Sequence, residues 1–183
     1  MEVNSFADLS LQEFKESYLG LMGEQNQQEK KGENINVEGD LRIDVEIDWV
    51  SLGKVTRVKD QKMCQSCWAF CSIAALESSY MIHQGLSSIE FSEQQLVDCS
   101  TPYGNKGCRG GELWFTFKYL QEKGVTTEGN YPYVGKDQNC KKTGGSFTMP
   151  NYGWDVTCGG LYRALVKGPV AVAVDALNWG FYK

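Results

Sequence analysis

Three cysteines lie within eight residues, about a third of the way along the chain, and this cluster constrains the fold more than any other feature. The stretch KDQKMCQSCWAFCS, residues 59–72, contains Cys64, Cys67 and Cys71. Such a cluster can hold a metal, form a redox pair, supply half of a structural disulfide or provide a nucleophile. Because the sequence has 7 cysteines in all, at least one thiol stays unpaired.

A metal or redox role fits the rest of the chain poorly. A zinc site needs a second close pair of ligands, and the other cysteines, at positions 99, 108, 140 and 158, form no second C-x-x-C. A thioredoxin-like pair follows a strand in a βαβ unit, and no such pattern precedes Cys64. We therefore expect no metal and no cofactor.

Cys67 is the candidate nucleophile because a helical pattern of apolar residues begins directly after Ser66. A thiol in the first turn of a helix lies beside free amide groups and the positive end of the helix dipole, and both stabilise a thiolate. Gln61, six residues earlier, can donate an amide hydrogen bond to an oxyanion, together with the backbone N–H of Cys67. This pattern favours attack of a thiolate on a carbonyl group.

Composition excludes several other classes of function. The 183 residues carry a formal charge of −5, so we expect binding neither to nucleic acid nor to an anionic membrane. No apolar run approaches the roughly 18 residues that a membrane span needs. The N-terminal MEVNSFADLS lacks the basic and apolar regions of a secretory signal, whereas the cysteine count suggests an oxidising compartment. We expect that the chain starts partway into a longer precursor.

Periodicity predicts helices in the middle of the chain and strands only near its end. The expected elements are a short helix behind a Ser10–Glu13 capping box, a polar linker over 23–40, an extended segment over 43–58, a helix from Ser66 to Gly85, a helix capped by Ser92 and Gln95, a helix over 112–123, a helical turn over 162–166 and a strand over 168–176. The last segment, GPVAVAVDA, reads as a strand that is buried on both faces.

The segment DQKMCQSCWAF resembles the active-site segment of papain-like cysteine peptidases, and of the cathepsin L group in particular. Further segments match in the same order: DWVSLGKVTRVKDQ, FSEQQLVDCS, GCRGG, YPY followed by Cys140, and GPVAVAVDA. The N-terminal NSFADLSLQEF resembles the end of the family's inhibitory propeptide. The resemblance implies an α+β papain-like fold, with the helical left domain present and only the start of the β-barrel right domain. Residues 1–42 would be a partial inhibitory propeptide, and residues 43–183 a peptidase domain that is incomplete at its C-terminus.

The resemblance also assigns roles to single residues. Cys67 matches the nucleophile and Gln61 the glutamine of the oxyanion hole. Gly110 and Gly111 match glycines whose backbone binds an extended substrate. Two further residues, Leu113 and Ala173, match walls of the apolar subsite for the substrate residue second from the scissile bond.

The same resemblance implies a disulfide pattern. It pairs Cys64 with Cys108 and Cys99 with Cys140, which leaves Cys67, Cys71 and Cys158 as free thiols.

Two residues depart from the family pattern beside the nucleophile. Lys62 and Gln65 replace glycines on either side of Cys64. Because substrate backbone passes close to residue 65, Gln65 is expected to narrow the cleft, or to adopt a strained backbone if the position requires a positive φ.

A papain-like mechanism needs a histidine to take the proton of the thiol and an asparagine to orient that imidazole. Both are expected roughly 130–150 residues after the cysteine, which lies beyond Lys183. His83, the single histidine, follows Cys67 by 16 residues, or about 24 Å along a helix. Asn178-Trp179-Gly180 is similar to the family's asparagine motif, but its position predicts a turn after a strand. We therefore expect a C-terminally truncated chain that is inactive alone.

Two functions follow from these expectations. The first is a cysteine endopeptidase of the zymogen type, which hydrolyses peptides through an acyl-enzyme on Cys67. The alternative is a non-catalytic papain-like protein that binds peptides or proteases. The expected partners are extended peptide or protein substrates and the chain's own propeptide as inhibitor, with a monomeric state. For the intact family member the expected location is the lysosome or the outside of the cell.

Overall fold

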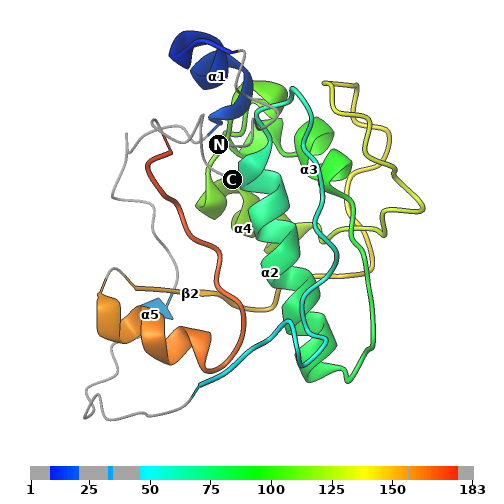
Figure 1. Ribbon diagram of the computed structural model, residues 1–183. Helices are drawn as coiled ribbons and strands as arrows, with labels where there is room; N and C mark the ends of the chain where they lie inside the picture. The colour runs from blue at the N-terminus through cyan, green and yellow to red at the C-terminus, as the bar shows by residue number, and fades with distance from the viewer. Residues whose placement is uncertain (1–8, 21–32, 35–45, 156, 177–183) are drawn as a thin grey trace.

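A central helix, α2 (Cys67–His83), organises the fold seen in the computed structural model, which describes residues 9–20, 33–34, 46–155 and 157–176 (Figure 1). Side chains on several of its faces are buried, Trp68, Ile73, Leu76 and Met81 among them. A helix that is apolar on most sides must lie inside the protein. The remaining elements are α1 (Leu11–Tyr18), β1 (Glu33–Asn34), α3 (Glu93–Cys99), the 3-10 turns Thr101–Tyr103 and Gly107–Arg109, α4 (Leu113–Glu122), β2 (Gly153–Trp154) and α5 (Cys158–Leu165).

Helices α3 and α4 pack against α2 and complete the core. Every residue of α3 is buried, and its N-cap Ser92 accepts a hydrogen bond from the backbone N–H of Gln95. The Gln95 side chain does not return to Ser92 as a full capping box requires. Instead, its amide donates to the hydroxyl of Tyr119 in α4, and its carbonyl accepts from the Thr126 backbone. Gln95 therefore links α3 to α4 and to the loop that follows.

Helix α1 lies far from the other helices in the sequence, but it forms as its local signals predict. Both halves of the capping box are present, because Ser10 Oγ accepts from the Glu13 backbone and Glu13 accepts from the Ser10 backbone. Phe14 is buried and stacks on Tyr18. The polar stretch predicted as a linker lies largely outside the described residues, but Glu33–Asn34 within it pairs in parallel with Gly153–Trp154.

The segment around residues 46–58 is less extended than predicted. Asp48 accepts hydrogen bonds from the backbone of Val50 and Ser51, which closes a turn. The Trp49 indole then donates to the Leu165 carbonyl at the end of α5, 2.7 Å away.

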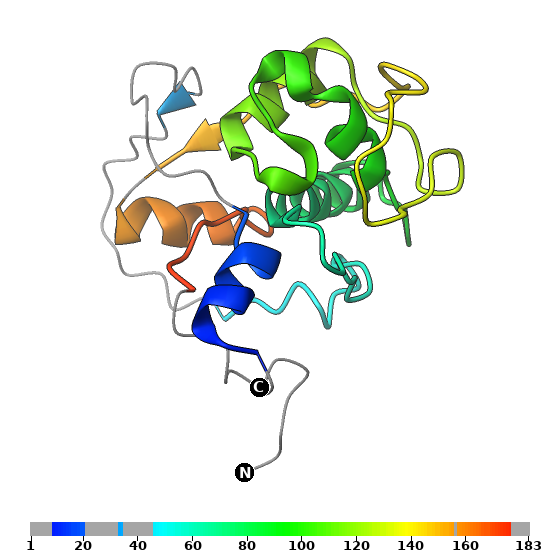
Figure 2. The same cartoon turned by 90° about the horizontal axis from the view of Figure 1, so that it is seen from above.

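The predicted strand over residues 168–176 is wrong. The described part of this segment is irregular, and Val172 and Val174 are 51% and 54% exposed. A strand that is buried on both faces needs neighbouring strands, and within the described chain the only named strands are β1 and β2, which pair with each other. The helical turn expected over 162–166 is a full helix, α5, that begins at Cys158. Figures 1 and 2 place α5 on one side of α2 and α3 on the other.

Candidate active site

Cys67 is the first residue of α2 and lines a cavity of about 410 Å³. The helix wall of this cavity consists of Cys67, Trp68 and Cys71, and Leu113 at the start of α4 contributes as well. The rest of the wall is formed by the last residue of α1, the two residues that follow it and the end of the described chain, namely Tyr18, Leu19, Gly20, Val172, Val174, Asp175 and Ala176. The thiol is therefore covered by a distant part of the same chain.

The Cys67 thiol does not have the lowered pKa that its place at a helix start predicted. Burial raises the pKa of Cys67, and this effect outweighs the backbone N–H groups of Gly20, Trp68 and Cys67 itself, which act to lower it. The charge of Glu112 raises the pKa further. In this closed arrangement the protonated thiol is favoured over the thiolate.

Gln61 lies in the loop before α2, and its side-chain amide donates to the Tyr18 carbonyl at 3.1 Å. Its own backbone carbonyl accepts from the Tyr133 hydroxyl at 2.8 Å. The same hydroxyl shares a hydrogen bond with Ser66 Oγ, the N-cap of α2, at 2.7 Å. Burial raises the pKa of Tyr133 to about 12, so this phenol stays protonated and remains a donor. The sequence matched Tyr133 only as part of YPY and gave no sign that it positions Gln61.

A buried ion cluster fixes the loop segment that leads to Gln61. Lys59 Nζ lies 2.7 Å from Glu77 of α2 and 2.6 Å from Glu93 of α3. Burial acts to lower the pKa of Lys59, but the two carboxylates outweigh burial and the pKa is raised. Burial raises the pKa of Glu93 to about 7 in spite of Lys59. The loop is thereby attached to both helices two residues before Gln61.

Gly110 and Gly111 play different parts in the structure. The N–H and C=O groups of Gly110 both bond within the turn, to Gly107 and Lys106, and its φ is +108°. Gly111 instead donates its N–H to the Gly20 carbonyl at 2.9 Å. A Cβ atom on Gly111 would lie 2.5 Å from the Trp68 ring, so only glycine fits there. The turn is held by Asn105, a residue that the sequence reading missed: its side chain accepts from the Glu112 backbone.

The two residues predicted to form the apolar subsite occupy different places. Leu113 lines the Cys67 cavity and also a neighbouring cavity of about 510 Å³ between α4 and α5. Ala173 lines only the second of these two cavities. The structure therefore brings Leu113, but not Ala173, to the wall of the cavity that holds the thiol.

The strained backbone that was one of two expectations for Gln65 is found at Lys62 instead. Among the described residues other than glycine, Lys62 alone has a positive φ, +56°, so the strained backbone falls there and not at Gln65. The Gln65 side-chain amide donates to the carbonyls of Lys15 and Glu16 in the last turn of α1.

The disulfides join Cys64 to Cys108 and Cys99 to Cys140, the same pairs that the resemblance implies. Cys67, Cys71 and Cys158 are free. The described residues contain no group of three or more His, Cys, Asp or Glu side chains that could hold a metal ion.

The single histidine, His83, ends α2 and is exposed, so the full length of the helix separates it from Cys67. The Asn178-Trp179-Gly180 motif lies outside the described residues. The part of the chain that the structure describes therefore places Gln61 and the Cys67 thiol against the same segment, residues 18–20, without an imidazole beside them.

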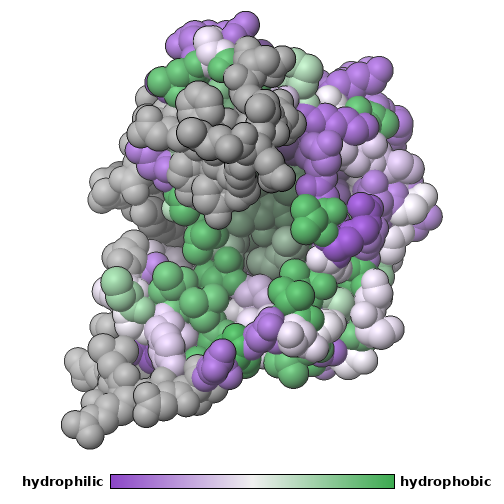
Figure 3. Space-filling view, viewed as in Figure 1, coloured by the Kyte–Doolittle hydropathy of each residue, from purple (hydrophilic) through white to green (hydrophobic). Residues whose placement is uncertain are grey.

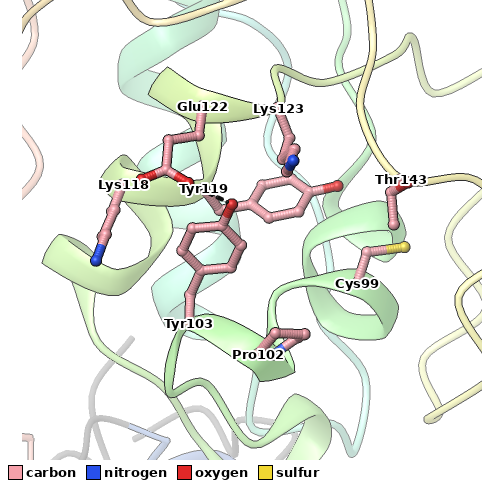
Figure 4. A pocket seen from close by; sticks show the side chains of 8 residues that line it. All are labelled: Cys99, Pro102, Tyr103, Lys118, Tyr119, Glu122, Lys123 and Thr143. Carbon is pink, nitrogen blue, oxygen red and sulfur yellow. Dashed lines mark hydrogen bonds between the residues drawn. The ribbon is translucent and has the colours of Figure 1, made fainter.

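A further cavity, lined by residues of α4 and of the turn Thr101–Tyr103, offers no comparable chemistry. It has a volume of about 580 Å³ and lies behind α4, where Figure 4 shows the Tyr103 hydroxyl bonded to Glu122 at 2.7 Å. Burial, followed by this carboxylate, raises the pKa of Tyr103 to about 12. The only sulfur among its lining residues, in Cys99, belongs to a disulfide.

No helix in the described ranges is long and apolar enough to cross a membrane.

Comparison with known proteins agrees with this geometry. The sequence profile of the "Papain family cysteine protease" matches residues 43–183. Cathepsin L2 of Homo sapiens is 38% identical over 192 residues, covering 100% of this chain and 56% of the relative. A cathepsin L-like proteinase of Fasciola hepatica is 40% identical over 182 residues, covering 94% of this chain and 54% of the relative.

A solved structure, a recombinant stem bromelain precursor, superposes with a TM-score of 0.82 at 32% identity, covering 97% of this chain and 57% of that one. The chain spans a little over half the length of the curated relatives that it matches. The profile, the relatives and the shared fold together identify the chain as a member of the papain family of cysteine proteases, with cathepsin L homologues.

Proposed function

We propose that this chain carries the thiol half of a cysteine endopeptidase site, closed by its own N-terminal segment. One observation carries the proposal: three separate groups of the candidate site all contact the backbone of residues 18–20. Gln61 donates to the Tyr18 carbonyl, Gly111 donates to the Gly20 carbonyl, and Cys67 lines one cavity with Tyr18, Leu19 and Gly20, whose N–H acts to lower the pKa of the thiol. These groups are the ones that a bound peptide would need.

In the open site, the chemistry is acyl transfer. The Cys67 thiolate forms a bond to the scissile carbonyl carbon, and the carbonyl electrons move to oxygen, where Gln61 Nε2 and the Cys67 N–H donate to the oxyanion. Collapse expels the amine, which takes up a proton, and leaves a thioester on Cys67. Water then hydrolyses the thioester and restores the thiol. His83 lies at the far end of α2, so the proton carrier is not among the groups placed beside Cys67.

Residues 1–42 act in this proposal as a partial inhibitory propeptide and residues 43–183 as the peptidase domain. A substrate places the residue bound by Gly111 before the residue whose carbonyl enters the oxyanion hole. Here Gly111 binds Gly20, whereas Gln61 binds the earlier residue Tyr18. The segment thus runs opposite to a substrate, and Cys67 faces no correctly oriented carbonyl. In this proposal the intact protease is a monomer in the lysosome or outside the cell. Its partners there are peptides or proteins that bind in an extended conformation.

The closure can be tested through the thiol. Cys67 alkylation is measured by peptide mass spectrometry before and after limited proteolysis removes the residues ahead of Ile43, with the exposed Cys158 as internal reference. We expect faster labelling of Cys67 only, and protection of the opened thiol by an extended peptide. Equal labelling before and after cleavage would contradict the proposal.

Catalysis is tested separately with a fluorogenic dipeptide substrate at pH 5.5 under reducing conditions. We expect no Cys67-dependent turnover by this chain alone. Turnover that Cys67→Ser abolishes would rule out the non-catalytic alternative, and would also contradict the expectation that this chain is inactive alone.

A further inference from the structure

We propose that Gln65 is a latch that recognises the C-terminal end of α1 and holds it over the thiol. This inference rests on the proposed function and names how the closed state is selected. The side-chain amide of Gln65 donates hydrogen bonds to two carbonyls at the end of a helix. Gln65 stands where the family pattern has a glycine.

The end of α1 presents acceptors that need a donor. The last four carbonyls of a helix have no partner within the helix, and they carry the negative end of its dipole. In α1, the Leu19 N–H reaches the Lys15 carbonyl only at 3.4 Å. Gln65 Nε2 donates to this carbonyl at 3.4 Å and also to that of Glu16. One amide therefore serves two adjacent carbonyls.

Gln65 is held in place by the covalent framework of the site. Its neighbour Cys64 is bonded to Cys108, and the Gln65 backbone N–H donates to the Cys108 carbonyl at 3.2 Å. Its own backbone packs so closely on Gly20 that a Cβ atom on Gly20 would overlap the Gln65 carbonyl oxygen. The donor is thus presented from a fixed loop, and the same residue contacts both α1 and the segment that covers Cys67.

This contact distinguishes a helical inhibitor from an extended substrate. Successive carbonyls of a helix point in the same direction along its axis, so one donor can reach both Lys15 and Glu16. Successive carbonyls of an extended peptide point to opposite sides, so such a peptide cannot present this pair. The backbone donor of Gly111 is open to either ligand, whereas the Gln65 side chain favours the helix.

The test compares Gln65→Ala and Gln65→Glu with a matched control, Gln121→Glu. Gln121 lies in α4 and donates its side-chain amide to the Pro150 carbonyl, so its variant loses the same kind of bond and gains the same charge away from the site. Cys67 alkylation at pH 7.5 is followed relative to Cys158, and hydrogen exchange is measured in α1 and α4.

We expect labelling of Cys67 to rise about three- to tenfold in Gln65→Ala, as loss of one hydrogen bond implies. The rise should be larger in Gln65→Glu, because a carboxylate cannot donate and is repelled by the carbonyl end of a helix. Exchange should increase in α1 and not in α4, and Gln121→Glu should leave the Cys67 rate unchanged.

Slow labelling of Cys67 in the wild type and in both Gln65 variants would overturn the latch while leaving the closure intact. Exchange that rises equally in α1 and α4 would also overturn it, since Gln65 would then be a general stabilising residue. Wild-type labelling as fast at Cys67 as at Cys158 would instead overturn the closure, and with it the proposed function.

Discussion

The helical half of the molecule and the segment that follows it are built very differently. The buried apolar cluster around α2, α3 and α4 runs from Cys64 to Met149, and each of the two disulfides has one cysteine in it, Cys64 and Cys99. In the described residues after 150, Gly160 alone is buried. Figure 3 shows apolar side chains gathered at the surface on the side of α5 and the segment 168–176. The exposed apolar residues of α5 and of this segment are Leu161, Leu165, Val172 and Val174.

This difference shows where the candidate site obtains its rigidity. Cys67, Gln61 and Gly111 all belong to the helical half, where the partly buried hydrogen bond from Tyr133 and the ion cluster of Lys59 hold the loop that carries Gln61. Val172 and Val174 contribute only a wall of the cavity. The thiol and the oxyanion donors proposed for it can therefore be placed by the helical half without a sheet behind them.

The strongest test of this contrast is a pair of identical truncations. Leu120 is fully buried in α4, at 0% exposure, whereas Leu165 at the end of α5 is 39% exposed. We expect Leu120→Ala to lower the free energy of unfolding by about 2–5 kcal/mol, since it leaves a cavity in the core. Leu165→Ala should change it by less than about 0.5 kcal/mol. Urea denaturation measures both, and similar losses would contradict the contrast.

Removing a cross-link from the helical half should have the next largest effect. The Cys64–Cys108 disulfide closes a separation of 44 residues. The double change Cys64→Ala and Cys108→Ala should cost about 3 kcal/mol in urea denaturation without reductant, because the unfolded chain gains freedom. The exposed free thiol Cys158, changed to Ala, serves as control and should have little effect. A negligible loss in the double variant would show that the core alone fixes the loop before Cys67.

Stability of the helical half should increase as the pH falls from about 8 to about 5 through Glu93. Its folded pKa is raised by burial to about 7 from an ordinary value of 4.5, so its contribution is fully present below 4.5 and is lost as the pH rises through 7. We expect this contribution to be on the order of 2 kcal/mol. Denaturation at several pH values should show a slope in the wild type that Glu93→Gln reduces. Equal slopes would contradict the raised pKa.

The smallest expected effect concerns Tyr133, which links Gln61 to the N-cap of α2. Tyr133→Phe removes both hydrogen bonds and should cost about 1 kcal/mol. The matched change Tyr152→Phe, beside the cavity between α4 and α5, should cost less. Hydrogen exchange of the loop around Gln61 should rise only in the Tyr133 variant. An unchanged loop would show that the ion cluster alone positions Gln61.

Local signals in the sequence predicted the elements that carry the thiol. The capping box of Ser10 and Glu13 and the apolar run after Ser66 place α1 and α2 correctly within a few residues. Such signals fail where a distant partner decides the outcome. GPVAVAVDA has the composition of a buried strand but forms none here, because burial and pairing depend on neighbouring strands.

Contacts between remote residues were equally invisible in the sequence. Tyr133 lies 72 residues from Gln61, and Gln65 lies 50 residues from Lys15, so no local pattern connects either pair. The sequence predicts a lowered pKa for Cys67, and this prediction is wrong for the same reason. Its helix-start position was evident, but the segment that buries it comes from the region around Gly20.

The rate of Cys67 alkylation as a function of pH tests most directly whether the thiol is covered by the N-terminal segment and protonated. Because burial raises the pKa of Cys67, its thiolate should form only above the roughly 8.5 of an ordinary thiol, and its labelling should stay slower than that of Cys158. A midpoint below pH 7, with Cys67 labelled faster than Cys158, would contradict a protonated and covered thiol.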